Sequence, residues 1–143
     1  MEKEQDNSYH KISLNWYPGH MAKTKREIEE DIKLIDVVVE IIDSRIPISS
    51  RNPDIKKILG NKDKIIVLNK SDLADKTENE KWVNFFKEQN QIAIIADCNS
   101  GKGVNEIIRT IEKLQVEKQE KYKEKGRIGR KIKVMVLRNS KCW

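Results

Sequence analysis

A short apolar run near the middle of the chain passes directly into a polar loop. The run is Lys64-Ile65-Ile66-Val67, and the segment after it is Leu68-Asn69-Lys70-Ser71-Asp72. An apolar run of this length, rich in β-branched residues and bounded by turn residues, predicts a buried strand. That strand would deliver an Asn-Lys-x-Asp loop at its carboxyl end. A buried strand needs cover on both faces, so the chain is expected to place helices around a sheet.

Strand and helix patterns alternate along the rest of the chain. The predicted strands are 37–42, 64–68, 92–96 and 132–137. Three of the predicted helices are 21–34, 53–59 and 103–123. A further helix is predicted to begin at a Thr77-x-x-Glu80 capping box and to run through Phe85 and Phe86. Buried strands joined by helices imply an α/β fold with a parallel sheet. The 143 residues suffice for one domain.

The Asn-Lys-x-Asp loop has the chemistry needed to recognise guanine. The Asp72 carboxylate can accept two hydrogen bonds, from N1–H and from the exocyclic amine, whereas adenine presents an acceptor in place of N1–H. The Asn69 amide can bind the other edge of the base and nearby loop backbone, while the Lys70 methylenes cover the ring face. The same residue types are common in solvated turns between a strand and a helix, so an ordinary turn remains the alternative.

A second polar loop follows the strand predicted at 92–96. It resembles the loop of GTP-binding proteins that supplies a backbone N–H to guanine O6, with Cys98-Asn99-Ser100 in place of the usual Ser-Ala-Lys. Taken alone, this segment is better interpreted as a turn before a helix. However, it follows Asn69 in the sequence by about one strand and one helix, and this spacing favours the interpretation that it forms the second half of a base site. The predicted GTP-binding residues are therefore Asn69, Lys70, Ser71, Asp72, Asp97, Cys98 and Asn99.

Three segments in the first third of the chain carry a family resemblance. They are Trp16-Tyr17-Pro18-Gly19-His20-Met21-Ala22-Lys23, Asp43-Ser44-Arg45-Ile46-Pro47 and Ser49-Ser50-Arg51-Asn52-Pro53. They resemble the signature segments of the YlqF family, the circularly permuted bacterial GTPases known as ribosome biogenesis GTPase A. In that family the guanine-specificity loop precedes the phosphate-binding loop. The resemblance covers nearly everything from Asn15 to Leu137, and Ser44 departs from it because the family usually has Ala there.

The resemblance implies a fold and a function. The fold is a partial three-layer parallel sheet of a circularly permuted P-loop GTPase domain, with the last strand beside residues 37–42. The function is binding of GTP, together with Mg²⁺ in the complete family protein, during assembly of the large ribosomal subunit and in contact with ribosomal RNA.

Two residues near the N-terminus gain possible roles from the same resemblance. The family lacks the usual catalytic glutamine, so His20 becomes a candidate for orienting the attacking water. A histidine beside glycine is more often a turn or capping residue, which is the alternative. Arg45 comes shortly after Asp43 and could contact phosphate or RNA, or could equally brace the loop.

The last residues of the chain depart from the family. By resemblance, strand 132–137 would continue into Gly-Ile-Pro-Asn-Val-Gly-Lys-Ser, the loop that binds phosphate, whereas this chain reads Arg138-Asn139-Ser140-Lys141-Cys142-Trp143. One synonymous choice of codons for Arg138 to Trp143 encodes Gly-Ile-Pro-Asn-Val-Gly when its first base is removed, so we expect a one-base frameshift. The expected organisation is a flexible N-terminus at 1–14, an incomplete GTPase domain at 15–137 and an aberrant tail at 138–143. Without the phosphate loop and the Mg²⁺ ligands, GTP hydrolysis by this chain is not expected.

Composition and charge set further bounds. Charged residues make up 36% of the chain, and no apolar run is long enough to cross a membrane. The N-terminus carries no charged-then-apolar signal segment, so the chain is expected in the cytoplasm. Cys98 and Cys142 have no paired spacing, and both are expected to be free thiols rather than metal ligands.

The formal net charge of +6 is concentrated before the last predicted strand. The basic residues there are Lys118, Lys121, Lys123, Lys125, Arg127, Arg130, Lys131 and Lys133. Early in this segment Glu and Lys at helical spacing favour a solvated helix end, but beyond Gly126 every charged residue is basic. The pattern permits RNA binding, with no DNA and no membrane expected. It leaves open a non-enzymatic basic α/β module that binds ribosomal RNA or a protein partner, and also a remnant without function.

Overall fold

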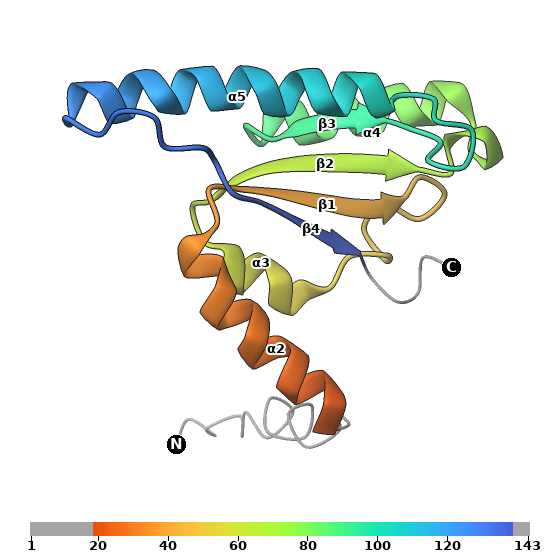
Figure 1. The fold of residues 1–143 in the computed structure, drawn as a ribbon. Helices are drawn as coiled ribbons and strands as arrows, with labels where there is room; N and C mark the ends of the chain where they lie inside the picture. Colours follow the sequence, from red (N-terminus) through yellow and green to blue (C-terminus); the bar gives the residue numbers. More distant parts are fainter. Residues whose placement is uncertain (1–18, 139–143) are drawn as a thin grey trace, which may run out of the picture. The chain divides into compact units, whose positions relative to one another are not determined.

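The computed structural model describes residues 19–138, with side chains from Ala22 onward (Figure 1). The segments expected to be a flexible N-terminus and an aberrant tail lie outside it, apart from Arg138. The chain divides into two compact units, Met1–Lys33 and Leu34–Trp143. Helix α2 (Gly19–Asp31) lies in the first unit and continues as a 3-10 turn, η1 (Ile32–Leu34). The helix predicted at 21–34 is therefore present and tightens in its last turn.

The second unit is built on a four-stranded parallel sheet. Its strands are β1 (Val37–Asp43), β2 (Asp63–Asn69), β3 (Ile92–Ile95) and β4 (Val134–Arg138), in the spatial order β3-β2-β1-β4 (Figure 1). All three strand pairs are parallel. The predictions of a parallel sheet, and of a last strand that lies beside the first, are confirmed.

Helices cover both faces of the sheet, which gives three layers. On one face, Ile107, Ile111 and Leu114 of α5 (Val104–Glu124) pack against a cluster formed by Val37, Val39, Ile65, Val67, Ile94 and Ala96. On the other face, α4 (Lys76–Glu88) contributes Phe86, Trp82 and Val83 to a cluster with Ile42, Ile66 and Leu68. Successive residues of a strand point to opposite faces, so one apolar run supplies both clusters. The predicted α/β fold class is confirmed.

The starts of α3 and α4 show how local side chains set the boundaries of helices. Helix α3 (Pro53–Leu59) begins as predicted, after Asn52, whose side chain accepts a hydrogen bond from the Asp54 N–H at 3.0 Å. For α4 the predicted capping box at Thr77 is wrong, because Asp75 Oδ1 accepts the hydrogen bond, from the Glu78 N–H at 3.0 Å. Aspartate caps helices at least as well as threonine, and it stands earlier in the chain.

Asp36 holds the segment that leads into β4. Its buried carboxylate accepts hydrogen bonds from Tyr122 Oη and from the Lys133 N–H, both at 2.8 Å, and lies 3.4 Å from Arg130 Nη2. Burial raises the pKa of Asp36, but the Lys133 and Tyr122 hydrogen bonds and the Arg130 charge outweigh it, so the pKa is lowered. We call these four residues the Asp36 clasp. Because Asp36 takes the Lys133 N–H, the strand predicted from residue 132 begins at Val134.

Candidate functional site

The carboxyl ends of β1, β2 and β3 lie at one edge of the sheet, and each strand passes into a loop there (Figure 1). Backbone hydrogen bonds join these loops. The Ser71 N–H donates to Ala96 O at 3.1 Å, and the Ser44 N–H donates to Asn69 O at 2.8 Å. Ligands of open parallel sheets bind outside the carboxyl ends of the strands. The loops after β1, β2 and β3 therefore form the candidate site.

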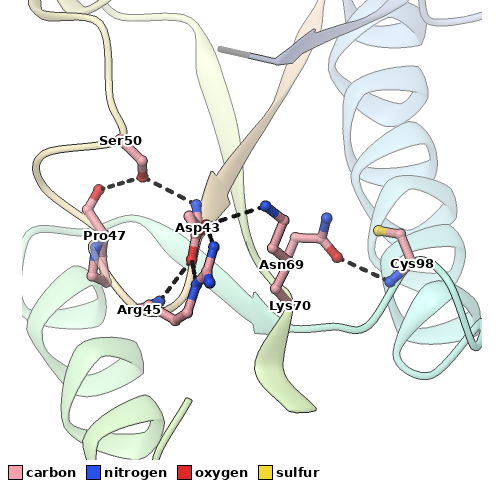
Figure 2. A network of polar contacts seen from close by, with 7 residues as sticks. All are labelled: Asp43, Arg45, Pro47, Ser50, Asn69, Lys70 and Cys98. Carbon is pink, nitrogen blue, oxygen red and sulfur yellow. Dashed lines mark hydrogen bonds and ion pairs between the residues drawn. The ribbon is translucent and has the colours of Figure 1, made fainter. Parts of the chain in front are cut away.

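A side-chain hydrogen bond joins the two loops for which the sequence predicts a shared base site. Asn69 Oδ1 accepts it from the Cys98 N–H at 2.9 Å, across 29 residues of chain (Figure 2). Asn69 is half-buried at the end of β2, whereas Cys98 is exposed. The Asn69 amide is thus engaged with loop backbone, one of the two uses expected of it. This bond brings the loops at 69–73 and 97–103 to one place.

The loop after β3 closes on itself around Asp97. The Asp97 N–H donates to Lys102 O at 2.9 Å, and Asp97 Oδ1 accepts from the Asn99 N–H at 3.1 Å. A hydrogen bond from the Ser100 side chain, aided by the backbone of Asn99 and Ser100, outweighs desolvation and holds the pKa of Asp97 below its usual value. Cys98 and Asn99 are exposed. A base oxygen that bound the Asn99 N–H would therefore share it with Asp97.

Lys70, Ser71 and Asp72 follow β2 in a tight turn. Lys70 has a left-handed backbone with φ 58°, and its Nζ lies 3.4 Å from Asp43 Oδ2. Ser71 is buried and Asp72 is exposed in the 3-10 turn η2 (Ser71–Leu73). The turn holds the Lys70 ammonium against the end of β1 and leaves the Asp72 carboxylate accessible to a ligand.

A pocket of about 450 Å³ lies beside Asp72. Cavities of this size bind small molecules. Of the seven predicted residues, Ser71, Asp72 and Asp97 line the pocket, whereas Asn69, Lys70, Cys98 and Asn99 do not. The buried α4 residue Asn79 lines it too, and among residues 22–138 its Oδ1 has no hydrogen-bond partner. Sequence reasoning missed Asn79, because an asparagine inside a helical pattern gives no signal of burial.

Asp43 ends β1 and holds the loop that follows it (Figure 2). Arg45 donates to both of its carboxylate oxygens, from Nε at 3.0 Å and from Nη2 at 2.7 Å. Of the two interpretations of Arg45, this geometry supports bracing of the loop. Sequence reasoning did not select Asp43 as a site residue, although its position directly after a strand was a usable signal. Ser44, where the family usually has Ala, is buried, which suits a small side chain.

The remaining predicted residues are His20 and the two cysteines. His20 lies in α2, in the first unit, and its side chain is outside the described part, so its assignment to water orientation stays a prediction. Cys142 also lies outside the described residues. Cys98 is an exposed free thiol, and partial desolvation of its sulfur, together with the charge of Asp97, raises its pKa.

Within residues 22–138, no group of three or more His, Cys, Asp or Glu side chains is placed to hold a metal ion. No helix between residues 19 and 138 is both long and apolar enough to cross a bilayer.

The sequence has close counterparts among known proteins. No protein-family model matches the chain. Ribosome biogenesis GTPase A from Bacillus cereus is 42% identical to it over 124 residues, which make up 87% of this chain and 42% of that protein. The chain belongs to the YlqF family, ribosome biogenesis GTPase A.

Two further proteins resemble this YlqF-family chain. Mitochondrial ribosome-associated GTPase 1 from Mus musculus is 38% identical over 100 residues, 69% of this chain and 31% of that protein. The crystal structure of GNP-bound YlqF from T. maritima matches 51% of this chain and 30% of that chain, at 39% identity. Its TM-score of 0.42 is too low to establish a shared fold. The YlqF-family chain spans less than half the length of the curated relatives it matches.

Proposed function

We propose that this chain carries the guanine-recognition part of a GTP-binding domain in a ribosome-assembly GTPase. One observation carries the proposal: the Asn69–Cys98 hydrogen bond joins the two loops from which a guanine site would be built. The names of its relatives, GTPases of ribosome biogenesis and of the mitochondrial ribosome, support GTP as the ligand. Because the chain spans less than half of the bacterial relatives, GTP hydrolysis, Mg²⁺ dependence and action in the cytoplasm are proposed for the whole protein.

Each polar group has its own task in the proposed base site. The Asp72 carboxylate accepts hydrogen bonds from N1–H and the exocyclic amine of guanine, and adenine would leave it desolvated and unpaired. Sites that hydrogen-bond their substrate in this way discriminate by roughly 10⁴-fold. The Lys70 methylenes cover one ring face, and O6 meets the Asn99 N–H, which it would share with Asp97. Asn69 fixes the distance between the loops, and Ser71 anchors the turn to the end of β3 through Ala96.

Three finer assignments belong to the same proposal. Residues 15–137 would supply one part of the GTPase domain of the whole protein. His20 would orient the attacking water there, because the family lacks the usual glutamine. The partner would be the large ribosomal subunit, contacted through its RNA. The names of the relatives support a ribosomal partner, and the charge of the segment before β4 supports RNA.

The basic segment at 125–133 favours a second candidate function, RNA binding by a non-enzymatic module. Its exposed cations Lys125, Arg127, Lys131 and Lys133 take part in no ion pair with the described residues. Arg130 differs, because it lies beside Asp36 and over the Tyr122 ring. Cations without carboxylate partners can bind the phosphates of RNA and release its counterions.

A change of base preference tests the guanine site. Asp72→Asn should weaken binding of GMP roughly tenfold or more and shift the preference toward XMP, whose 2-oxo group accepts a hydrogen bond where guanine donates one. NMR titration of the chain with GMP, XMP and AMP measures this preference. Asp63→Asn, which removes an exposed carboxylate at the opposite end of β2, should leave it unchanged. Equal GMP affinity in parent and Asp72→Asn would remove Asp72 from the site.

A further inference from the structure

Asp43 lies where the loop after β1 meets the proposed base site. It is the last residue of β1, is 2% exposed and lies opposite Asn69 in the parallel register. Its N–H donates to Ser50 Oγ at 3.0 Å, and Ser50 Oγ donates to Pro47 O at 3.3 Å. These two bonds hold the backbone of Asp43 without using its carboxylate.

The carboxylate of Asp43 contacts two cations from different loops (Figure 2). Arg45 reaches both oxygens through its side chain, and its N–H also donates to Oδ1 at 2.9 Å. Lys70, which follows β2, places Nζ 3.4 Å from Oδ2. A buried carboxylate needs a partner that compensates its desolvation. Arg45 already supplies a bidentate one, so the second cation is not required to neutralise Asp43.

The contact between Asp43 and Lys70 matters more for the Lys70 side chain than for Asp43. The Lys70 side chain is 16% exposed, whereas that of Arg45 is 46% exposed. Lysine has a flexible four-carbon stem, and a ligand that needs this stem in one position must order it on binding. A side chain that is ordered before the ligand arrives makes binding less costly. Asp43 thus fixes, in advance, the residue expected to cover the base.

We infer that Asp43 is a positioning residue for the base site, which holds Lys70 where its methylenes cover the ring face of guanine. The inference rests on the proposed function, because that function gives Lys70 a base to cover. It assigns Asp43 a task beyond bracing the loop after β1 through Arg45. Positioning and bracing predict different responses to the same substitution.

The first experiment measures the order of the Lys70 side chain. Carbon-13 relaxation of lysine Cε groups reports their fast motion, and Lys70→Arg assigns the Lys70 signal. Asp43→Asn removes the charge with little change of shape, and should raise the mobility of Lys70 toward that of the exposed Lys113. Asp36→Asn is the matched control, because it neutralises a buried carboxylate just before the other end of β1 and should leave Lys70 unchanged. Unchanged Lys70 order in Asp43→Asn would overturn the inference.

The second experiment is a double-mutant cycle on GMP binding. Asp43→Asn should weaken binding roughly five- to tenfold, a coupling typical of residues in contact. In a Lys70→Ala background the same substitution should have no further effect, because the group that Asp43 positions is gone. A loss of equal size in both backgrounds, or an equal loss in Asp36→Asn, would assign Asp43 to loop structure alone and overturn the inference.

Failure of the proposed function gives a different result from failure of this inference. If the parent binds GMP, XMP and AMP alike, or binds none of them, guanine recognition fails and the role of Asp43 fails with it. If the parent prefers GMP but the cycle shows no coupling between Asp43 and Lys70, guanine recognition stands and the role of Asp43 fails alone.

Discussion

At the scale of single residues, the charge of Asp43 links folding to acid pH. Hydrogen bonds from Arg45 are the main cause that lowers the pKa of Asp43 to about 2 from 3.8, against the opposing effect of burial. Because the folded-state pKa is below the unfolded one, the ionised carboxylate stabilises the fold fully at pH values above the unfolded pKa of 3.8. This stabilisation is lost as the pH falls toward about 2, and the full shift corresponds to about 2 kcal/mol.

Asp43→Asn should therefore reduce the acid sensitivity of the fold. Between about pH 6 and about pH 2.5, the free energy of unfolding should fall by about 1.5 kcal/mol less in this variant than in the parent. Arg45→Ala keeps the carboxylate and removes its main partner, so its fall in unfolding free energy should lie between those of the parent and of Asp43→Asn. Urea denaturation at both pH values measures the difference. The same pH dependence in all three proteins would show that Asp43 has an ordinary pKa.

The residues of the candidate site differ in how far sequence can reveal them. Asn69 and Asp72 could be proposed because the hydrogen-bonding edges of guanine require an amide and a carboxylate at a fixed spacing. The contact between Asp43 and Lys70 could not, since it depends on the register that sets Asp43 opposite Asn69 across two strands. The burial of Asn79 likewise depends on how α4 packs, which local pattern does not encode.

At the scale of elements, apolar runs predicted the strands, but the start of α4 shows where local pattern is ambiguous. Asp75-Lys76-Thr77 offers two side chains that can cap a helix, and each has a Glu three residues later. Both satisfy the same sequence rule, and only the position of the first helical turn separates them. The place of β4 beside β1 came from the family resemblance, because strand periodicity does not fix strand order.

The two candidate caps of α4 make a matched pair of substitutions. Asp75→Ala should destabilise the fold by about 1 kcal/mol, since it leaves the Glu78 N–H without its acceptor. Thr77→Ala, inside the first turn, should change stability by less than about 0.5 kcal/mol. Urea denaturation of both variants distinguishes them. A larger loss for Thr77→Ala would restore the capping box first expected there.

Two glycines in the loop before α5 make another matched pair. Gly101 and Gly103 have similar backbone angles, φ 81° and φ 83°, so alanine is strained at both. A Cβ on Gly101 would meet open space, whereas one on Gly103 would lie 2.4 Å from Ile95 O. Gly101→Ala should cost about 1 kcal/mol, and Gly103→Ala about 1–2 kcal/mol more, because the loop must move away from β3. Equal losses of stability would mean that the loop yields without cost.

At the scale of the whole molecule, surface charge separates the two candidate functions. Changing Lys125, Arg127, Lys131 and Lys133 to Gln should lower affinity for ribosomal RNA at least about tenfold, and should reduce the slope of log affinity against log salt by about 3. The control changes Lys56, Lys57, Lys87 and Lys113 to Gln, which removes the same charge from other exposed sites. Filter binding over a range of salt concentrations measures both.

Each outcome of this RNA experiment favours a different candidate function. RNA affinity that is unaffected by GMP and by Asp72→Asn would favour the non-enzymatic module. RNA affinity that changes with GMP, and loses this response in Asp72→Asn, would favour the GTPase. An equal loss of affinity in both Gln variants would remove the segment at 125–133 as the RNA-binding surface, since net charge alone would then explain it.

The Asp36 clasp also determines when β4 can join the sheet during synthesis of the chain. Its hydrogen bond between Asp36 and the Lys133 N–H joins residues 97 apart in sequence, whereas β2 follows β1 after a single short helix. Contacts this distant form late, because a long loop must close before they are gained. At roughly 5–20 residues per second, synthesis would leave one edge of β1 unpaired for roughly 5–20 s. An open edge can pair with other chains, so the speed of translation, rather than the final stability, governs this exposure to aggregation.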